Sequence, residues 1–150
     1  MSAKKILVTG GCGYIGSHTI VDLLESGYDV VSVDNGINSS FSVLKGIEAI
    51  TGKKVTNINV DLSETDEALD VIKAHGYFDG IIHFAALKSV EESVYQPLRY
   101  FRNNIGSTLT TMTLMEELDI PHLIFSSSCT VYGTPEKLPV NEETPMGRAE

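Results

Sequence analysis

The 150-residue sequence has no tryptophan, only two cysteines and a shortage of positive charge. It has 11 lysines and arginines against 20 aspartates and glutamates, which gives a formal net charge of −9. An acidic surface repels a phosphate backbone, so a nucleic-acid partner is disfavoured. Cys12 and Cys129 lie far apart in the sequence and match no metal-ligand spacing. They predict small, buried, reduced thiols in a cytoplasmic protein, and no metal site.

Long hydrophobic runs are also missing. Lys4 and Lys5 are followed by only three apolar residues before the first glycines, which is too short for a targeting segment. No run approaches the length that spans a bilayer, so no membrane partner is expected. The 42% of hydrophobic residues nevertheless suffices for one domain with a core, and no linker is evident before about residue 133.

Apolar runs of strand length alternate with helical patterns along the chain, which is typical of stacked βαβ units. The predicted strands are 4–10, 28–35, 54–61, 78–86 and 121–128, and the predicted helices are 14–27, 40–52, 63–76 and 97–118. Gly27 and Gly52 are expected to end the first two helices, and Ser63 to cap the third. Right-handed crossovers then favour a Rossmann-like, doubly wound parallel α/β sheet in the order 3-2-1-4-5.

Two of the predicted helices carry apolar residues at helical spacing. The inner side of the first is expected to hold Ile15, Ile20, Leu23 and Leu24. The last carries Leu98, Phe101, Ile105, Leu109, Met112 and Met115, the two methionines being expected in core or interface packing.

The stretch TGGCGYIGSH places three glycines between the first strand and the first helix. Gly11, Gly13 and Gly16 satisfy GxGxxG, and Gly10, Gly13 and Gly16 satisfy GxxGxxG. In this context one glycine permits a tight turn, one lets a pyrophosphate approach the backbone, and one allows close helix packing. The helix N-terminus offers free N–H groups to that pyrophosphate. The loop therefore predicts dinucleotide binding.

An acidic residue lies at the expected distance from this loop. Asp34 ends the second strand 18 residues after Gly16, close to the offset of about 20 for a carboxylate that binds the adenosine ribose. A carboxylate there repels a 2′-phosphate, so NAD is preferred to NADP. The alternative for Asp34 is an ordinary turn residue, because DNGINSS is rich in turn formers. Asp61 has the same two interpretations, as an adenine-side contact or as a turn residue before a helix.

Ser128 follows the last predicted strand at its carboxyl end, where ligands bind in such sheets. Its hydroxyl can hold a substrate hydroxyl while another group removes the proton. The alternative is plain turn polarity in the run SSS. Lys88 is either a solvated loop cation or a cofactor contact, and His83, within IIHFAA, is expected to be a hydrogen-bonded core residue.

The segments TGGCGYIGSH, VDNGINSS, HFAALKSVEES and FSSSCTVYG, with their spacing, resemble the extended short-chain dehydrogenase/reductase family. The resemblance runs from Lys4 to about Gly147, and within the family it is to the 4-epimerases of UDP-hexoses. It implies interconversion of UDP-glucose and UDP-galactose with tightly held NAD. It also implies a possible homodimer through the helix at about 97–118.

The family's functional positions map onto this sequence. Cofactor contacts are implied for Gly10, Gly13, Tyr14, Ile15, Gly16, Asp34, Asn35, Asn38, Ser39, Asp61, Leu62, Phe84, Ala85, Ala86, Lys88 and Asn104. Catalytic roles are implied for Ser128, which would bind the sugar hydroxyl being oxidised, and for Thr130, which would assist it. Ala86 and Ser107 stand where the family commonly has glycine.

The family's general base, the tyrosine of a YxxxK pair, has no counterpart here. The fourth residues after the six tyrosines are His18, Ser32, Ile81, Arg99, Asn104 and Glu136, none of them lysine. By resemblance the pair would begin soon after residue 150. We therefore expect 1–150 to be an NAD-binding Rossmann domain truncated before the later strands, lacking the substrate portion and inactive alone, with its last strand left open. Alternatives are a related sugar-nucleotide dehydratase or uronate epimerase, and a non-catalytic NAD-binding module.

Overall fold

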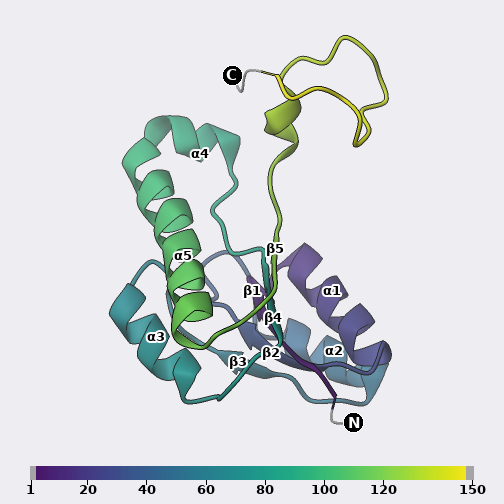
Figure 1. The fold of residues 1–150 in the computed structure, drawn as a ribbon, viewed down its shortest axis with the longest axis vertical. Coiled ribbons are helices and arrows are strands. Elements are labelled where there is room, and N and C mark those ends of the chain that lie inside the picture. The colour runs from purple at the N-terminus through teal and green to yellow at the C-terminus, as the bar shows by residue number, and fades with distance from the viewer. Residues whose placement is uncertain (1–2, 148–150) are drawn as a thin grey trace.

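Strands and helices alternate along the chain in the computed structural model, which describes residues 3–147 (Figure 1). The strands are β1 (Lys5–Thr9), β2 (Asp29–Val33), β3 (Thr56–Ile58), β4 (Gly80–His83) and β5 (Leu123–Phe125). The helices are α1 (Tyr14–Glu25), α2 (Val43–Thr51), α3 (Thr65–Lys73), α4 (Val90–Tyr95) and α5 (Pro97–Glu117). None of the helices in the described residues is both long and apolar enough to cross a membrane.

The strands form one parallel sheet in the order β3-β2-β1-β4-β5, which confirms the predicted fold. Leu7 of β1 pairs with Val31 of β2 on one side and with Ile81 of β4 on the other. The strand order reverses direction between β1 and β4. In open α/β sheets the ligand site lies beside this reversal, at the carboxyl ends of the strands.

Helices cover both faces of the sheet (Figure 1). On the face of α1 and α2, the core includes Val8, Val30 and Ile82 together with Ile20, Leu24 and Ile47. On the face of α3 and α5, it includes Leu7, Val31 and Ile81 together with Leu69, Ile72 and Leu114. Neighbouring strand residues thus enter opposite cores, which explains why the strands are continuous apolar runs rather than alternating ones.

Helix ends follow the sequence signals in part. Gly27 and Gly52 have positive φ angles of 88° and 69°, where a side chain would strain the backbone, and they follow α1 and α2 as predicted. The prediction that Ser63 caps α3 is wrong, because the helix begins at Thr65 with Glu64 in the cap position. The Ser63 hydroxyl instead donates to Asp61 Oδ1 at 2.7 Å, in the turn before the helix.

Helix α4 was not expected from the apolar pattern. It begins after Ser89, whose hydroxyl accepts a hydrogen bond from the Glu92 N–H at 3.3 Å. The Ser-x-x-Glu spacing that commonly begins a helix was therefore present in SVEES. The helix is short and has no buried residue, so it has little hydrophobic periodicity to detect.

The apolar stripe of α5 faces outward. Leu98, Phe101, Ile105, Leu109 and Met112 are 52–70% exposed, while the buried side of the helix carries Tyr100, Ser107, Thr110, Thr111 and Leu114. Small polar residues let the helix approach the sheet closely. Ile15 also departs from the prediction, because it is 54% exposed rather than on the inner side of α1.

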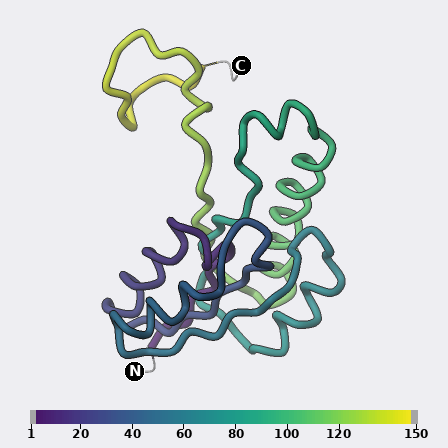
Figure 2. The backbone as a smooth tube through the Cα atoms, turned by 180° about the vertical axis from the view of Figure 1, so that it is seen from behind, coloured from purple at the N-terminus to yellow at the C-terminus, as the bar shows by residue number. Residues whose placement is uncertain are grey.

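The chain leaves the sheet after β5. Ser126 N donates the last sheet hydrogen bond to His83 O, and a short 3₁₀ helix (Cys129–Tyr132) and a loop then extend away from the domain (Figures 1 and 2). Ile124 and Phe125 are 62% and 51% exposed, which confirms the open face expected of the last strand. Cys129 is exposed, contrary to the prediction, whereas Cys12 is buried.

Candidate cofactor-binding site

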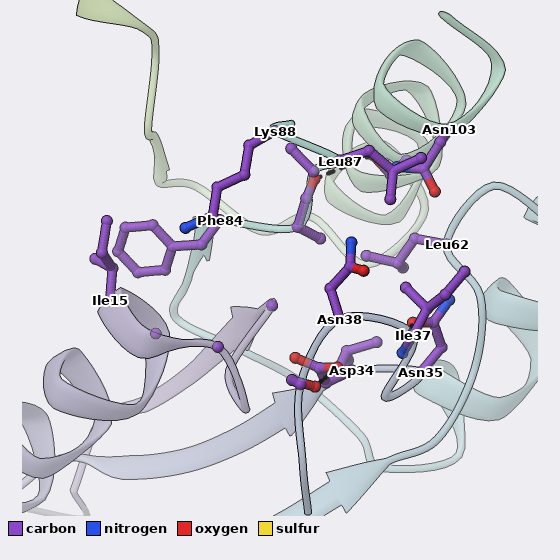
Figure 3. Close-up of a pocket in the computed structure, with 18 of the residues that line it drawn as sticks. Ile15, Asp34, Asn35, Ile37, Asn38, Leu62, Phe84, Leu87, Lys88 and Asn103 are labelled. Atoms are coloured by element: carbon purple, nitrogen blue, oxygen red, sulfur yellow. Dashed lines mark hydrogen bonds between the residues drawn. The ribbon is translucent and has the colours of Figure 1, made fainter. Parts of the chain in front are cut away.

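A pocket of about 420 Å³ lies at the carboxyl ends of the strands (Figure 3). Its volume is within the range of small-molecule sites. It brings together the predicted cofactor residues Gly10, Gly13, Tyr14, Ile15, Gly16, Asp34, Asn35, Asn38, Ser39, Asp61, Leu62, Phe84, Ala85, Ala86 and Lys88. Asp34, Asn35, Ile37 and Asn38 lie at one end, and Leu87, Lys88 and Asn103 at the other (Figure 3).

The three glycines of the loop serve different steric needs. Gly10 has a φ of +67°, and a Cβ there would lie 2.9 Å from the Ala85 nitrogen. A Cβ on Gly16 would overlap the Gly10 carbonyl oxygen, so this glycine lets α1 pack on the loop. At Gly13 a Cβ would meet only the Gly10 oxygen, at 3.2 Å. Gly13 therefore keeps a wall of the pocket open, as the close approach of a pyrophosphate requires.

Helix α1 directs its N-terminus to the same place. Gly13 is the N-cap, and the first helical hydrogen bond runs from Ser17 N to Gly13 O at 2.9 Å. The N–H groups of Tyr14, Ile15 and Gly16 precede that bond and have no partner within the helix. The first turn holds no acidic side chain. These groups and the helix dipole fit a bound anion.

Asp34 is fixed where β2 meets the glycine loop. Its Oδ2 accepts the Cys12 N–H at 2.9 Å. Its Oδ1 accepts the Gly36 N–H at 2.9 Å and the Ser39 hydroxyl at 2.7 Å. Asp34 is thus a turn residue and a pocket residue at once, so the two interpretations of the sequence do not compete. The carboxylate carries negative charge into the end of the pocket where a ribose would need acceptors.

Asp61 is tied to two neighbouring loops. Its Oδ2 accepts a hydrogen bond from Asn35 Nδ2 at 3.1 Å, and its Oδ1 accepts bonds from the Ser63 N–H and hydroxyl. Leu62 follows it in the pocket wall. The β2–α2 and β3–α3 loops therefore hold each other in place.

Cys12 is part of the glycine loop, but its side chain is buried and does not line the pocket. Burial and the nearby Asp34 carboxylate raise the pKa of its thiol to about 11, so the thiol stays protonated at neutral pH. It donates to Asn57 Oδ1 at 3.6 Å, and the same oxygen accepts the Ser32 hydroxyl at 2.7 Å. Asn57 Nδ2 donates to Asp34 O at 3.1 Å. Asn57 and Ser32 belong to no recognisable motif, so this support could not be found from the sequence.

The loop after β4 forms the opposite wall of the pocket. Phe84 lines the pocket together with Ile15 of α1 (Figure 3). Asn104 holds this loop from α5, since its Oδ1 accepts the Leu87 N–H at 2.8 Å and its Nδ2 donates to Leu87 O at 3.0 Å. The pocket is lined by Asn103 and Ser107 instead. A cofactor contact of Asn104 stays a prediction, and these two neighbours, one helical turn apart, were not expected as lining residues.

The predicted catalytic hydroxyls, those of Ser128 and Thr130, lie close together in the segment that follows β5. Ser128 Oγ is 2.8 Å from Thr130 Oγ1 and accepts the Thr130 N–H at 3.3 Å. Both residues are exposed. Ser126 and Ser127 line the pocket, whereas Ser128 and Thr130 are not among its lining residues.

A parallel sheet in this order, a glycine loop before α1 and an acidic residue after β2 define a Rossmann-type dinucleotide-binding domain. Comparison with known proteins names the family. Residues 6–150 match the NAD dependent epimerase/dehydratase family, and the chain belongs to it.

Similar proteins are known as sequences and as structures. The chain is 49% identical over 142 residues to a UDP-glucose 4-epimerase of Dictyostelium discoideum and to one of Bacillus subtilis, in each case over 95% of its length. It spans only 41% and 42% of those two proteins. A UDP-glucose 4-epimerase from Bifidobacterium longum, solved in complex with NAD+ and UDP, is 48% identical, with a TM-score of 0.89. That match covers 96% of this chain and 43% of the solved one.

Proposed function

We propose that this chain is the NAD-binding portion of a UDP-glucose 4-epimerase, which interconverts UDP-glucose and UDP-galactose. The observation that carries the proposal is the joining of the glycine loop, Asp34 and the loop after β4 in one pocket. The 49% identity to two UDP-glucose 4-epimerases over nearly the whole chain supports the substrate class.

The residues of the pocket fit NAD from end to end. The N–H groups at the start of α1, beside Gly13, would hold the pyrophosphate. Asp34 would accept the adenosine ribose hydroxyls and would repel the 2′-phosphate of NADP. The nicotinamide half would lie toward Phe84 and Lys88, near the serines that follow β5.

The cofactor would supply a hydride acceptor and donor at C4 of the sugar. Ser128 would hold the C4 hydroxyl by a hydrogen bond, and Thr130 would orient the Ser128 hydroxyl through their 2.8 Å contact. The resemblance assigns removal of the hydroxyl proton to the tyrosine of a YxxxK pair, which this sequence does not contain. The described residues therefore contribute cofactor binding and substrate orientation.

The proposal is tested by assaying the protein, at its natural length in its source, with UDP-galactose. Conversion to UDP-glucose, lost when NAD is stripped and restored when it is added back, is the expected result. Turnover of UDP-glucuronate alone, or dehydration of a nucleotide sugar, would instead identify the related uronate epimerase or dehydratase.

A non-catalytic NAD-binding module is the second candidate. Binding of NAD by the natural-length protein without conversion of any of these substrates would establish it. Conversion by the 150-residue chain alone would exclude the module and would also show that the tyrosine is dispensable.

We also propose a homodimer through α5 and a cytoplasmic location. The exposed stripe Leu98, Phe101, Ile105, Leu109 and Met112 would be covered by a second copy. The double variant Phe101→Lys, Leu109→Lys is expected to be monomeric by light scattering. Ile50→Lys, at a 67% exposed position on α2, is the control and should not change the mass. An unchanged mass in the double variant would contradict this interface.

A further inference from the structure

The hydroxyl of Thr9 joins β1 to the pocket wall. Thr9 is the last residue of β1 and is fully buried. Its Oγ1 accepts hydrogen bonds from the N–H groups of Phe84 and Ala85, at 3.2 and 3.3 Å, and the Phe84 N–H is shared with the Thr9 carbonyl oxygen at 3.1 Å. The same oxygen lies 2.8 Å from His83 Nδ1. One hydroxyl thus contacts the three residues at which β4 becomes the wall of the pocket.

The direction of the Thr9–His83 hydrogen bond follows from the donors present. A hydroxyl has one hydrogen and two lone pairs, and a backbone N–H can only donate. Phe84 and Ala85 therefore use both lone pairs of Thr9, and its hydrogen is left for His83 Nδ1. The nearby Thr111 hydroxyl, 3.1 Å from Nδ1, donates to Ser107 O at 2.8 Å. Thr111 therefore has no hydrogen for Nδ1, and Thr9, the closer hydroxyl at 2.8 Å, is the donor to it. This places the proton of the neutral ring on Nε2.

The surroundings of His83 keep the ring neutral. The residue is 3% exposed, and its ring stacks on that of Phe125 with centroids 5.7 Å apart. Burial lowers the pKa of His83 to about 4. The Nδ1 lone pair is therefore available to Thr9 at neutral pH.

The loop that Thr9 holds packs closely against the glycine loop. A Cβ on Gly10 would lie 2.9 Å from both the Phe84 carbonyl carbon and the Ala85 nitrogen, so the two loops touch backbone to backbone. A shift of Phe84 and Ala85 would move one wall of the pocket relative to the other.

We infer that Thr9 and His83 form a positioning pair for cofactor binding. In this pair the Nε2–H tautomer of His83 accepts the Thr9 hydroxyl hydrogen, so that both Thr9 lone pairs hold Phe84 and Ala85 in place. The inference rests on the proposed binding of NAD in this pocket. It differs from simple core packing because it depends on a hydroxyl and on one tautomer, not on side-chain volume.

The affinity test compares threonine variants of the protein at its natural length. Thr9→Val keeps the shape and removes the hydroxyl, and NAD binding by calorimetry is expected to weaken about 10-fold. Thr9→Ser, which keeps the hydroxyl, should bind within about 2-fold of wild type. Thr110→Val is the matched control, because Thr110 is also fully buried and its hydroxyl bonds to Thr65, away from the pocket. It should lower stability without changing NAD affinity.

The tautomer is measured in the wild-type protein by NMR of labelled histidine, with a His83→Phe variant to assign the signal. A neutral Nε2–H ring supports the pair, and an Nδ1–H ring overturns it even where Thr9→Val fails to fold. NAD binding by wild type together with a Thr9→Val variant that binds as tightly as Thr110→Val overturns the positioning pair alone. Absence of NAD binding by the wild-type protein overturns the proposed function and this role with it.

Discussion

Two regions at the carboxyl edge of the sheet differ in how their polar groups are held: the cofactor end, around Asp34 after β2, and the serine end, around Ser128 after β5. At the Asp34 end, hydrogen bonds from the glycine loop and from its own turn fix the carboxylate, while Asn35 and Ser63 fix Asp61. At the Ser128 end, the two predicted catalytic residues are exposed, and the bonds described for their side chains lie within the Ser128–Thr130 turn. The cofactor end is thus pre-formed by neighbouring loops, whereas the serine end leaves its orientation to be set by what packs on it.

The largest effect is expected from breaking the cofactor end at Gly16. In Gly16→Ala, the new Cβ would overlap the Gly10 backbone oxygen, so the loop and α1 must move apart. We expect NAD affinity to fall at least about 100-fold and the free energy of unfolding to fall by about 3 kcal/mol. Calorimetry and denaturant unfolding measure the two quantities.

Gly46→Ala is the control for that substitution. Gly46 also lies within a helix, and a Cβ there would meet nothing within 4 Å. It should raise stability by about 0.5–1 kcal/mol and leave NAD affinity unchanged. If Gly16→Ala and Gly46→Ala had the same NAD affinity and the same free energy of unfolding, the close packing at Gly16 would not be needed for either property.

A substitution at the serine end should slow epimerisation without weakening NAD binding. Ser128→Ala removes the hydroxyl proposed to hold the substrate, and in the natural-length protein we expect epimerisation to slow about 100-fold. NAD affinity should stay within about 2-fold of wild type, because Ser128 is not among the pocket-lining residues. Ser93→Ala, on the outer helix α4, should change neither quantity. A parallel loss of NAD affinity in Ser128→Ala would contradict the division between the two ends.

Acid should lower the stability of the folded protein through His83, the last residue of β4. Its pKa is about 4 in the folded protein against 6.5 for an unperturbed histidine, so the unfolded chain binds a proton first as the pH falls. The stability due to neutral His83 is full above about pH 6.5 and is lost progressively as the pH falls toward 4. The shift corresponds to about 3 kcal/mol.

Carboxylates titrate over part of the same pH range, so the contribution of His83 is measured as the difference in stability between wild type and a variant without the histidine. Denaturant unfolding from pH 7 to 4 is compared for wild type and His83→Asn. The variant should lose less stability over this interval, and identical pH profiles would contradict a neutral buried His83.

The smallest expected effect is a difference in reactivity between Cys12, at the cofactor end, and Cys129, at the serine end. With a pKa of about 11, about one Cys12 thiol in a thousand is ionised at pH 8, and the side chain is buried. Cys129, on the exposed serine end, is expected to react first with iodoacetamide, as followed by peptide mass spectrometry. Preferential labelling of Cys12 would show that the glycine loop opens readily.

Local signals in the sequence predicted the strands, most of the helices, the glycine loop and Asp34, the handedness of crossovers predicted the sheet order, and the family resemblance supplied most other pocket residues. Apolar runs, glycines with positive φ and the spacing from Gly16 to Asp34 require no knowledge of tertiary contacts. Helix α4 lacks apolar periodicity, and Ser63 was misassigned because its hydroxyl bonds to Asp61 rather than to the helix. Tertiary hydrogen bonding overrode a local preference there.

Long-range contacts explain what sequence reasoning missed. Asn57 supports Asp34 and Cys12 from another strand, and the Thr9–His83 contact joins residues 74 positions apart. The outward stripe of α5 was visible as a periodic pattern, but a pattern does not say whether the core or a second surface covers it. Only the position of α5 over the sheet shows that its small polar side faces inward.

The most direct test of the central claim, that the glycine loop and Asp34 form an NAD site, is calorimetric titration with NAD and with NADP. We expect wild type to bind NAD and to bind NADP at least about 10-fold more weakly, and we expect Asp34→Ala to bring the two affinities closer together. Equal affinities of wild type for the two nucleotides, or no binding of either, would contradict the claim.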